Sequence, residues 1–122
     1  MTRTPGVTRS RLGATATAAA ARRRGASVGV VGPTGRRREL LAAIGRELRF
    51  PGYYGGNLDA LEECLGDLSW LPAGQVVLVW DGDDELRRAD PAGHAALLDV
   101  LTEAAEQSEA GPRPLHVLLT PH

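Results

Sequence analysis

The chain has 122 residues, of which 43% are hydrophobic, and this suits one small globular domain with a core of modest size. No stretch approaches the roughly 18 consecutive apolar residues of a membrane-spanning helix, so the sequence predicts a chain that does not cross a membrane. The single cysteine, Cys64, has no partner for an internal disulfide, which favours a cytoplasmic protein with this thiol in its core.

The formal net charge of −1 conceals two segments of opposite sign. Residues 1–24 contain six of the 14 arginines, no acidic residue and hardly any large apolar side chain. We expect residues 1–24 to be a basic, disordered tail; a nucleic-acid-binding arm, or a translation start upstream of the true one, are the alternatives. Residues 25–122 carry all 15 acidic residues and eight arginines, a net charge of −7, so no nucleic acid is expected to bind the folded domain.

A strand and two helices are predicted for the first half of this domain. Residues 26–31 (ASVGVV) are rich in β-branched side chains and end at a Gly-Pro-Thr-Gly turn, which predicts a short strand. Residues 36–49 repeat apolar side chains at helical spacing, and Pro51 ends this helix. A second helix is predicted from residue 58 to residue 68.

The second half of the domain again alternates predicted strands with a predicted helix. Residues 75–80 (QVVLVW) form a continuous apolar run, which is typical of a strand covered on both faces. Asp90 and Pro91 predict the start of a third helix that extends to residue 107, and residues 116–120 (HVLLT) predict a last strand. The order β-α-α-β-α-β predicts an α/β fold, a small three-stranded parallel sheet with packed helices. The intervening DGDDE at residues 81–85 does not match a calcium-binding loop and is expected to be a solvated loop.

The second helix separates apolar from acidic side chains. At about 100° per residue, its polar side holds four acids, namely Asp59, Glu62, Glu63 and Asp67. No arginine lies on this helix, although like charges three or four residues apart destabilise a helix by roughly 0.2–0.5 kcal/mol per pair. The four acids are either a solvated face that maintains solubility or a docking surface for a cationic partner.

The loop before this helix favours the docking surface. The stretch FPGYYGGNLDAL, residues 50–61, places two tyrosines and two glycines directly before the probable N-cap, Asn57. Tyrosines suit contact surfaces, and glycines let a backbone approach its partner closely. An aromatic side chain beside an acidic helix complements a positively charged cleft.

The contiguous motif YYGGNLDALEECL resembles the barstar family of intracellular ribonuclease inhibitors, and the likeness extends over residues 25–120 in the order of elements. The resemblance implies a barstar-like domain at residues 25–122 and a function as an inhibitor of a microbial guanyl-specific ribonuclease in toxin immunity. It also implies that the loop and the second helix enter the basic active site of the enzyme.

The resemblance assigns roles to single residues. It implies that five residues contact the enzyme, namely Tyr53, Gly55, Asn57, Leu58 and Asp59. Glu63 takes the position of the carboxylate that mimics an RNA phosphate, and Glu103 on the third helix corresponds to a further acidic contact. Glu62 and Asp67 complete the acidic surface. Glu63 replaces an Asp of the best-known member, and Glu62 and Leu68 replace aromatic residues, so the target need not be barnase.

The remaining features indicate neither an enzyme nor a cofactor. His94, His116 and His122 are scattered without metal-ligand spacing or a neighbouring nucleophile, so we expect no catalytic residue, metal or cofactor. The expected partner is a secreted-type ribonuclease, and the free protein is expected to be monomeric. The alternative is a barstar-like interaction module that binds a different basic protein or toxin.

Overall fold

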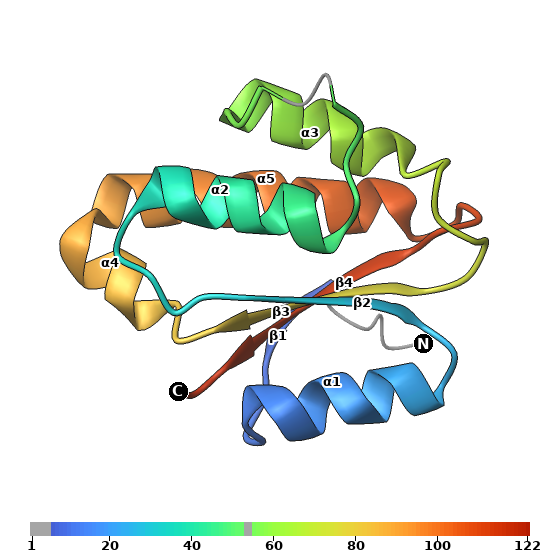
Figure 1. Ribbon diagram of the computed structural model, residues 1–122, viewed down its shortest axis with the longest axis horizontal. Coiled ribbons are helices and arrows are strands. Elements are labelled where there is room, and N and C mark those ends of the chain that lie inside the picture. Colours follow the sequence, from blue (N-terminus) through green and yellow to red (C-terminus); the bar gives the residue numbers. More distant parts are fainter. Residues whose placement is uncertain (1–5, 53–54) are drawn as a thin grey trace.

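Four parallel strands form the centre of the computed structural model, which describes residues 6–52 and 55–122 (Figure 1). The strands are β1 (Val7–Arg9), β2 (Ser27–Val31), β3 (Val76–Asp81) and β4 (Leu115–Thr120). Their order across the sheet is β1-β4-β3-β2, and every neighbouring pair is parallel. All six residues of β3 are buried because this strand pairs on both sides and is covered on both faces.

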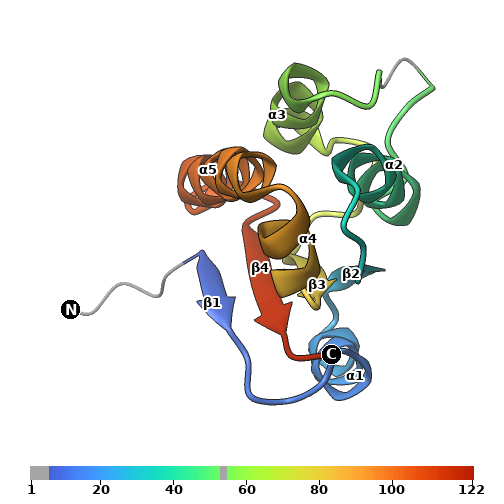
Figure 2. The ribbon, with the colours of Figure 1, turned by 90° about the vertical axis from the view of Figure 1, so that its left-hand side faces the viewer.

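Helices cover both faces of the sheet (Figure 2). They are α1 (Ala14–Arg23), α2 (Arg37–Glu47), α3 (Leu58–Asp67), α4 (Asp84–Ala89) and α5 (Pro91–Ser108). Helix α1 lies alone on one face, whereas α2, α4 and α5 lie on the other. Helix α3 packs on α5 and α2 rather than on the sheet, so it forms an outer layer and is open to solvent on its far side.

The core has two parts of unequal size, one on each face of the sheet. The larger part packs leucines of the helices against alternate residues of β3, including Leu78 and Trp80. The smaller part packs Ala18 and Ala21 of α1 against Val77 and Val79. Alternation along β3 therefore supplies both parts of the core, since successive side chains of a strand point to opposite faces.

The sheet has four strands rather than the three predicted, and the observed order β-α-β-α-α-β-α-α-β differs from the predicted β-α-α-β-α-β. The additional strand β1 and helix α1 lie within the segment expected to be a disordered tail, so that expectation does not hold for residues 6–24. Small side chains account for this difference: alanines bury little area each, but they let α1 approach the sheet closely.

The stretch at residues 81–85 is not a solvated loop, because Asp81 and Asp83 are buried at the end of β3. Both Arg9 guanidinium NH groups donate to the carboxylate of Asp83, at 3.1 and 3.3 Å, and Nε2 of His94 lies 2.9 Å from Oδ2. Burial opposes ionisation of Asp83, yet the hydrogen bonds and charges of Arg9 and His94 hold the pKa of this carboxyl below its ordinary value. This network connects β1 to α5 across the sheet, and it agrees with the expectation that His94 is structural.

Candidate partner-binding surface

Helix α3 begins and ends at well-defined caps. The side chain of Asn57 accepts a hydrogen bond from the backbone N–H of Ala60 at 2.8 Å, which satisfies one of the free amides of the first turn. The helix ends at Leu68, whose φ of 50° is left-handed. Leu61, Cys64 and Leu65 are buried beneath it, so the apolar side predicted from the sequence is confirmed.

The opposite side of α3 is acidic and exposed. Its carboxylates belong to Asp59, Glu62, Glu63 and Asp67, which together we call the acidic surface. None of the four forms an ion pair with any residue in the ranges 6–52 and 55–122. Burial, followed by the charges of Glu63 and Asp67, raises the pKa of the Cys64 thiol. This thiol therefore stays protonated at neutral pH, chiefly because it is buried.

A glycine interrupts the acidic surface. Gly66 is exposed on α3, and a Cβ atom built there meets no neighbouring atom within 4 Å. No packing contact therefore requires glycine at this position, although glycine costs a helix about 1 kcal/mol relative to alanine. The backbone of α3 is open to a partner beside Glu63 and Asp67.

The structure brings a second helix to the acidic surface. Helix α5 packs against α3 and carries Glu103, which is exposed and accepts a hydrogen bond from Gln107 Nε2 at 3.1 Å. Gln107 therefore offers the carboxylate of Glu103 one neutral hydrogen-bond donor on the surface of α5. The sequence analysis did not single out Gln107, although its spacing of four residues from Glu103 on one helix was the available signal.

The loop residues predicted to contact a partner lie at the start of α3. Gly55 and Asn57 are exposed, and Leu58 is half-buried and packs against the larger part of the core. Leu58 therefore contributes to both the core and the rim of the surface. Tyr53 lies outside the described residues.

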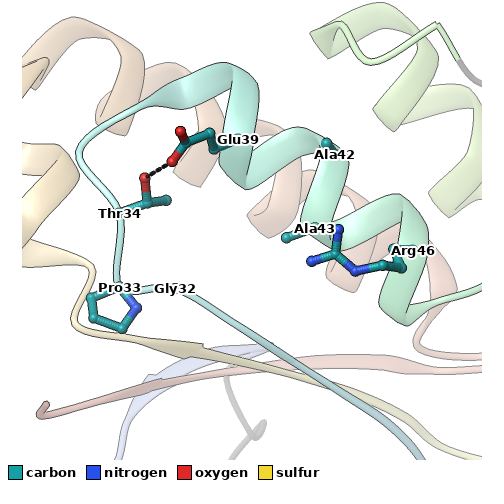
Figure 3. A pocket seen from close by; sticks show the side chains of 7 residues that line it. All are labelled: Gly32, Pro33, Thr34, Glu39, Ala42, Ala43 and Arg46. Atoms are coloured by element: carbon teal, nitrogen blue, oxygen red, sulfur yellow. Dashed lines mark hydrogen bonds between the residues drawn. The ribbon is translucent and has the colours of Figure 1, made fainter.

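A separate concave surface lies between α2 and the loop that follows β2 (Figure 3). Its volume is about 370 Å³, and its rim includes Glu39, which accepts a hydrogen bond from Thr34 Oγ1 at 2.8 Å, and Arg46. None of the residues predicted to contact a partner lines this pocket. This pocket therefore lies apart from the acidic surface.

Neither a metal-ligand group nor a membrane-spanning helix is found among the described residues. Among residues 6–52 and 55–122, no three His, Cys, Asp or Glu side chains are placed to hold a metal ion together. Within the same ranges, no helix is long and apolar enough to cross a membrane.

Fold and surface together define an α/β domain that presents a capped acidic helix, with a second acidic side chain from the helix beside it. The chain belongs to the Barstar (barnase inhibitor) family, whose model matches residues 34–120. This match confirms the resemblance seen in the sequence, and members of this family are inhibitors rather than enzymes. Strand β1 and helix α1 lie outside the matched residues.

Proposed function

We propose that the protein inhibits a microbial guanyl-specific ribonuclease by inserting α3 and the preceding loop into the active site of the enzyme. The observation that supports this most strongly is the acidic surface, whose four exposed carboxylates form no ion pair in the described part of the chain. A solvated face would tolerate the same charges, but membership of the Barstar family favours a docking role.

The chemistry of a ribonuclease cleft explains why carboxylates bind there. Such a cleft holds arginine, lysine and histidine side chains that bind the phosphodiester of RNA, and a carboxylate can accept the same charge-assisted hydrogen bonds. In the proposed complex, Glu63 occupies the phosphate position, with Asp59 and Glu103 as flanking acceptors. Inhibition is then competitive with RNA, and it protects the cytoplasm of the producing cell.

The structure also keeps the entropic cost of binding low. The cap at Asn57 and the buried side chains of Leu61 and Leu65 hold α3 in one orientation before any partner arrives. The carboxylates therefore lose only side-chain freedom on binding. Glu62 and Asp67 extend the negative field, which steers a basic partner toward α3.

Titration of the protein into a microbial guanyl-specific ribonuclease tests this proposal, with RNA cleavage as the readout. We expect stoichiometric inhibition by the parent and by Glu85→Ala, a matched control that removes an exposed glutamate from α4. Glu63→Ala should weaken inhibition by at least about tenfold while its thermal stability is unchanged or raised. Equal inhibition by both variants would show that Glu63 is not part of the binding site. A large loss of stability in Glu63→Ala would show that Glu63 has a structural role.

The salt dependence of association tests the role of charge. Raising the ionic strength should slow association with the ribonuclease more than it accelerates dissociation, because long-range attraction is screened first. Association rates that do not change with salt would contradict steering by the acidic surface.

The alternative function is an interaction module for a different basic protein or toxin, since Glu62, Glu63 and Leu68 alter the surface relative to the best-known member. A pull-down from the native cell discriminates between the two. Recovery of a basic partner without nuclease activity, together with no ribonuclease, would favour the module.

A further inference from the structure

Five arginines gather at the end of the molecule where β2, β3 and β4 begin. They are Arg22, Arg23, Arg24, Arg49 and Arg113, which together we call the arginine edge. Helix α1 ends at Arg23, Arg49 follows the end of α2, and Arg113 precedes the start of β4. The end of α1 and the loops before β3 and β4 lie at the right-hand end of the view in Figure 1, opposite the C-terminus.

Backbone hydrogen bonds tie the loops at this end together. The N–H of Ser27 donates to Gln75 O at 2.9 Å, which joins the loop after α1 to the loop before β3. The N–H of Gly74 donates to Pro112 O at 2.8 Å, which joins the loop before β3 to the loop before β4. These bonds therefore hold the loops that carry Arg24 and Arg113 at the same edge of the sheet.

A shallow groove of about 200 Å³ lies beside Arg49. Its lining includes Ser27, Arg49 and Leu71, and Nε of Arg113 donates to the carbonyl of Leu71 at 2.7 Å. Glu47 also lines the groove, but its carboxylate accepts a hydrogen bond from the backbone N–H of Val30 at 3.0 Å. The groove therefore holds one arginine, Arg49, with Arg113 beside it through Leu71, and its one acid, Glu47, is hydrogen-bonded to β2.

Only some of these arginines stabilise the folded protein. Arg22 and Arg23 lie in the last turn of α1, where cations stabilise the helix dipole. Arg49 has the opposite effect on stability, because its φ of 57° is left-handed, a backbone conformation that is unfavourable for a non-glycine residue. None of the five arginines forms an ion pair within the described ranges of the chain.

We propose that the arginine edge binds the phosphate backbone of nucleic acid. All the basic residues of the chain are arginines, whose planar guanidinium groups bind phosphates in a bidentate manner. Leu12, which precedes the start of α1, is the one large apolar side chain that the described residues expose, so the edge offers no apolar anchor for a lipid surface.

The arrangement revises an expectation from the sequence. The net charge of −7 on residues 25–122 argues against binding of nucleic acid by the folded domain, but Arg49 lines a groove with Ser27, three residues after Arg24, and Arg113 reaches Leu71 of the same groove. The fold therefore brings basic residues from both parts of the chain to one end of the molecule, where Arg113 also lines a pocket with Asp67. The proposal does not depend on ribonuclease inhibition, since none of the residues changed in its test belongs to the acidic surface.

Fluorescence anisotropy of a labelled 20-nucleotide single-stranded RNA and a DNA duplex of the same length tests the proposal, at salt concentrations from 50 to 200 mM. The test variant changes Arg22, Arg23 and Arg24 to Gln. The matched control changes Arg36, Arg37 and Arg38 to Gln, which removes three exposed arginines from the start of α2 and leaves the same net charge. Circular dichroism confirms that each variant is folded.

We expect the test variant to bind at least about tenfold more weakly than the parent, with a salt slope on single strands smaller by about 2. The control should bind as the parent does. Arg49→Gly should also weaken binding while it raises the melting temperature, because glycine relieves the left-handed backbone. If both triple variants bind equally more weakly than the parent, net charge rather than the position of the arginines determines binding, and the proposal is overturned. Failure of the parent to bind either nucleic acid at 50 mM salt would also overturn the proposal. The same holds if the parent, in a parallel measurement, binds anionic vesicles but not nucleic acid.

Discussion

Replacing Asp83 by asparagine tests the buried network that joins the first strand to the helices. Asp83 is 1% exposed and accepts three hydrogen bonds, two from Arg9 and one from His94. Asparagine keeps the shape but loses the negative charge and replaces one acceptor oxygen by a donor NH2 group, so it cannot accept all three hydrogen bonds. A hydrogen bond to a charged group contributes about 1.5–3 kcal/mol, so we expect a loss of about 2–4 kcal/mol in unfolding free energy.

Thermal unfolding measures this loss. For a chain of this size, about 2–4 kcal/mol corresponds to a melting temperature lower by roughly 8–16 °C. The matched control is Asp84→Asn, because Asp84 pairs with Arg88 at 2.7 Å on the surface, and such exposed pairs contribute at most about 1 kcal/mol. A melting temperature for Asp83→Asn within 2 °C (about 0.5 kcal/mol) of the control would refute the assignment of stability to this network.

Three other predictions concern pH and single side chains. Because the pKa of Asp83 is lower in the folded state, its stabilisation is present above the unfolded value of about 4 and is lost as the pH falls through the folded value. Acid titration followed by circular dichroism should therefore show a shallower loss of stability in Asp83→Asn, and an identical profile would contradict this. Gly66→Ala should raise the unfolding free energy by about 0.5–1 kcal/mol, whereas Gly29→Ala should lower it by about 1–3 kcal/mol, because its Cβ would lie 2.8 Å from Glu47 Cβ. Chemical denaturation measures both, and effects of the same sign would refute the packing argument. Asn57→Ala should cost about 1 kcal/mol through loss of the cap in the same assay, while Asn57→Asp should retain it; equal losses would contradict the cap.

The elements predicted with success from the sequence are those whose large apolar side chains repeat at a regular spacing. The observed α2, α3, β3 and α5 overlap the predicted ranges, because leucines and valines mark their buried sides. The acidic side of α3 followed from the same periodicity. The roles assigned to its residues stay predictions, since they depend on a partner.

The N-terminal elements were missed because their signals are weak or distant. Strand β1 has three residues, and α1 contributes alanines that a composition argument counts as incapable of filling a core. A signal did exist, since the continuous apolar run of β3 predicts cover on both faces, and α1 supplies the second cover. Burial of Asp83 depends on Arg9, 74 positions earlier, and no local pattern predicts such a contact.

Helix α1 also sets a limit on how the chain can be shortened. A protein that began at residue 25 would keep every residue matched by the family model, yet it would leave Val77 and Val79 without the alanines that cover them. An uncovered valine-rich sheet face is a surface on which copies of the chain would aggregate. Shortening at that point would therefore cost solubility before it affected the acidic helix on the far side of the fold.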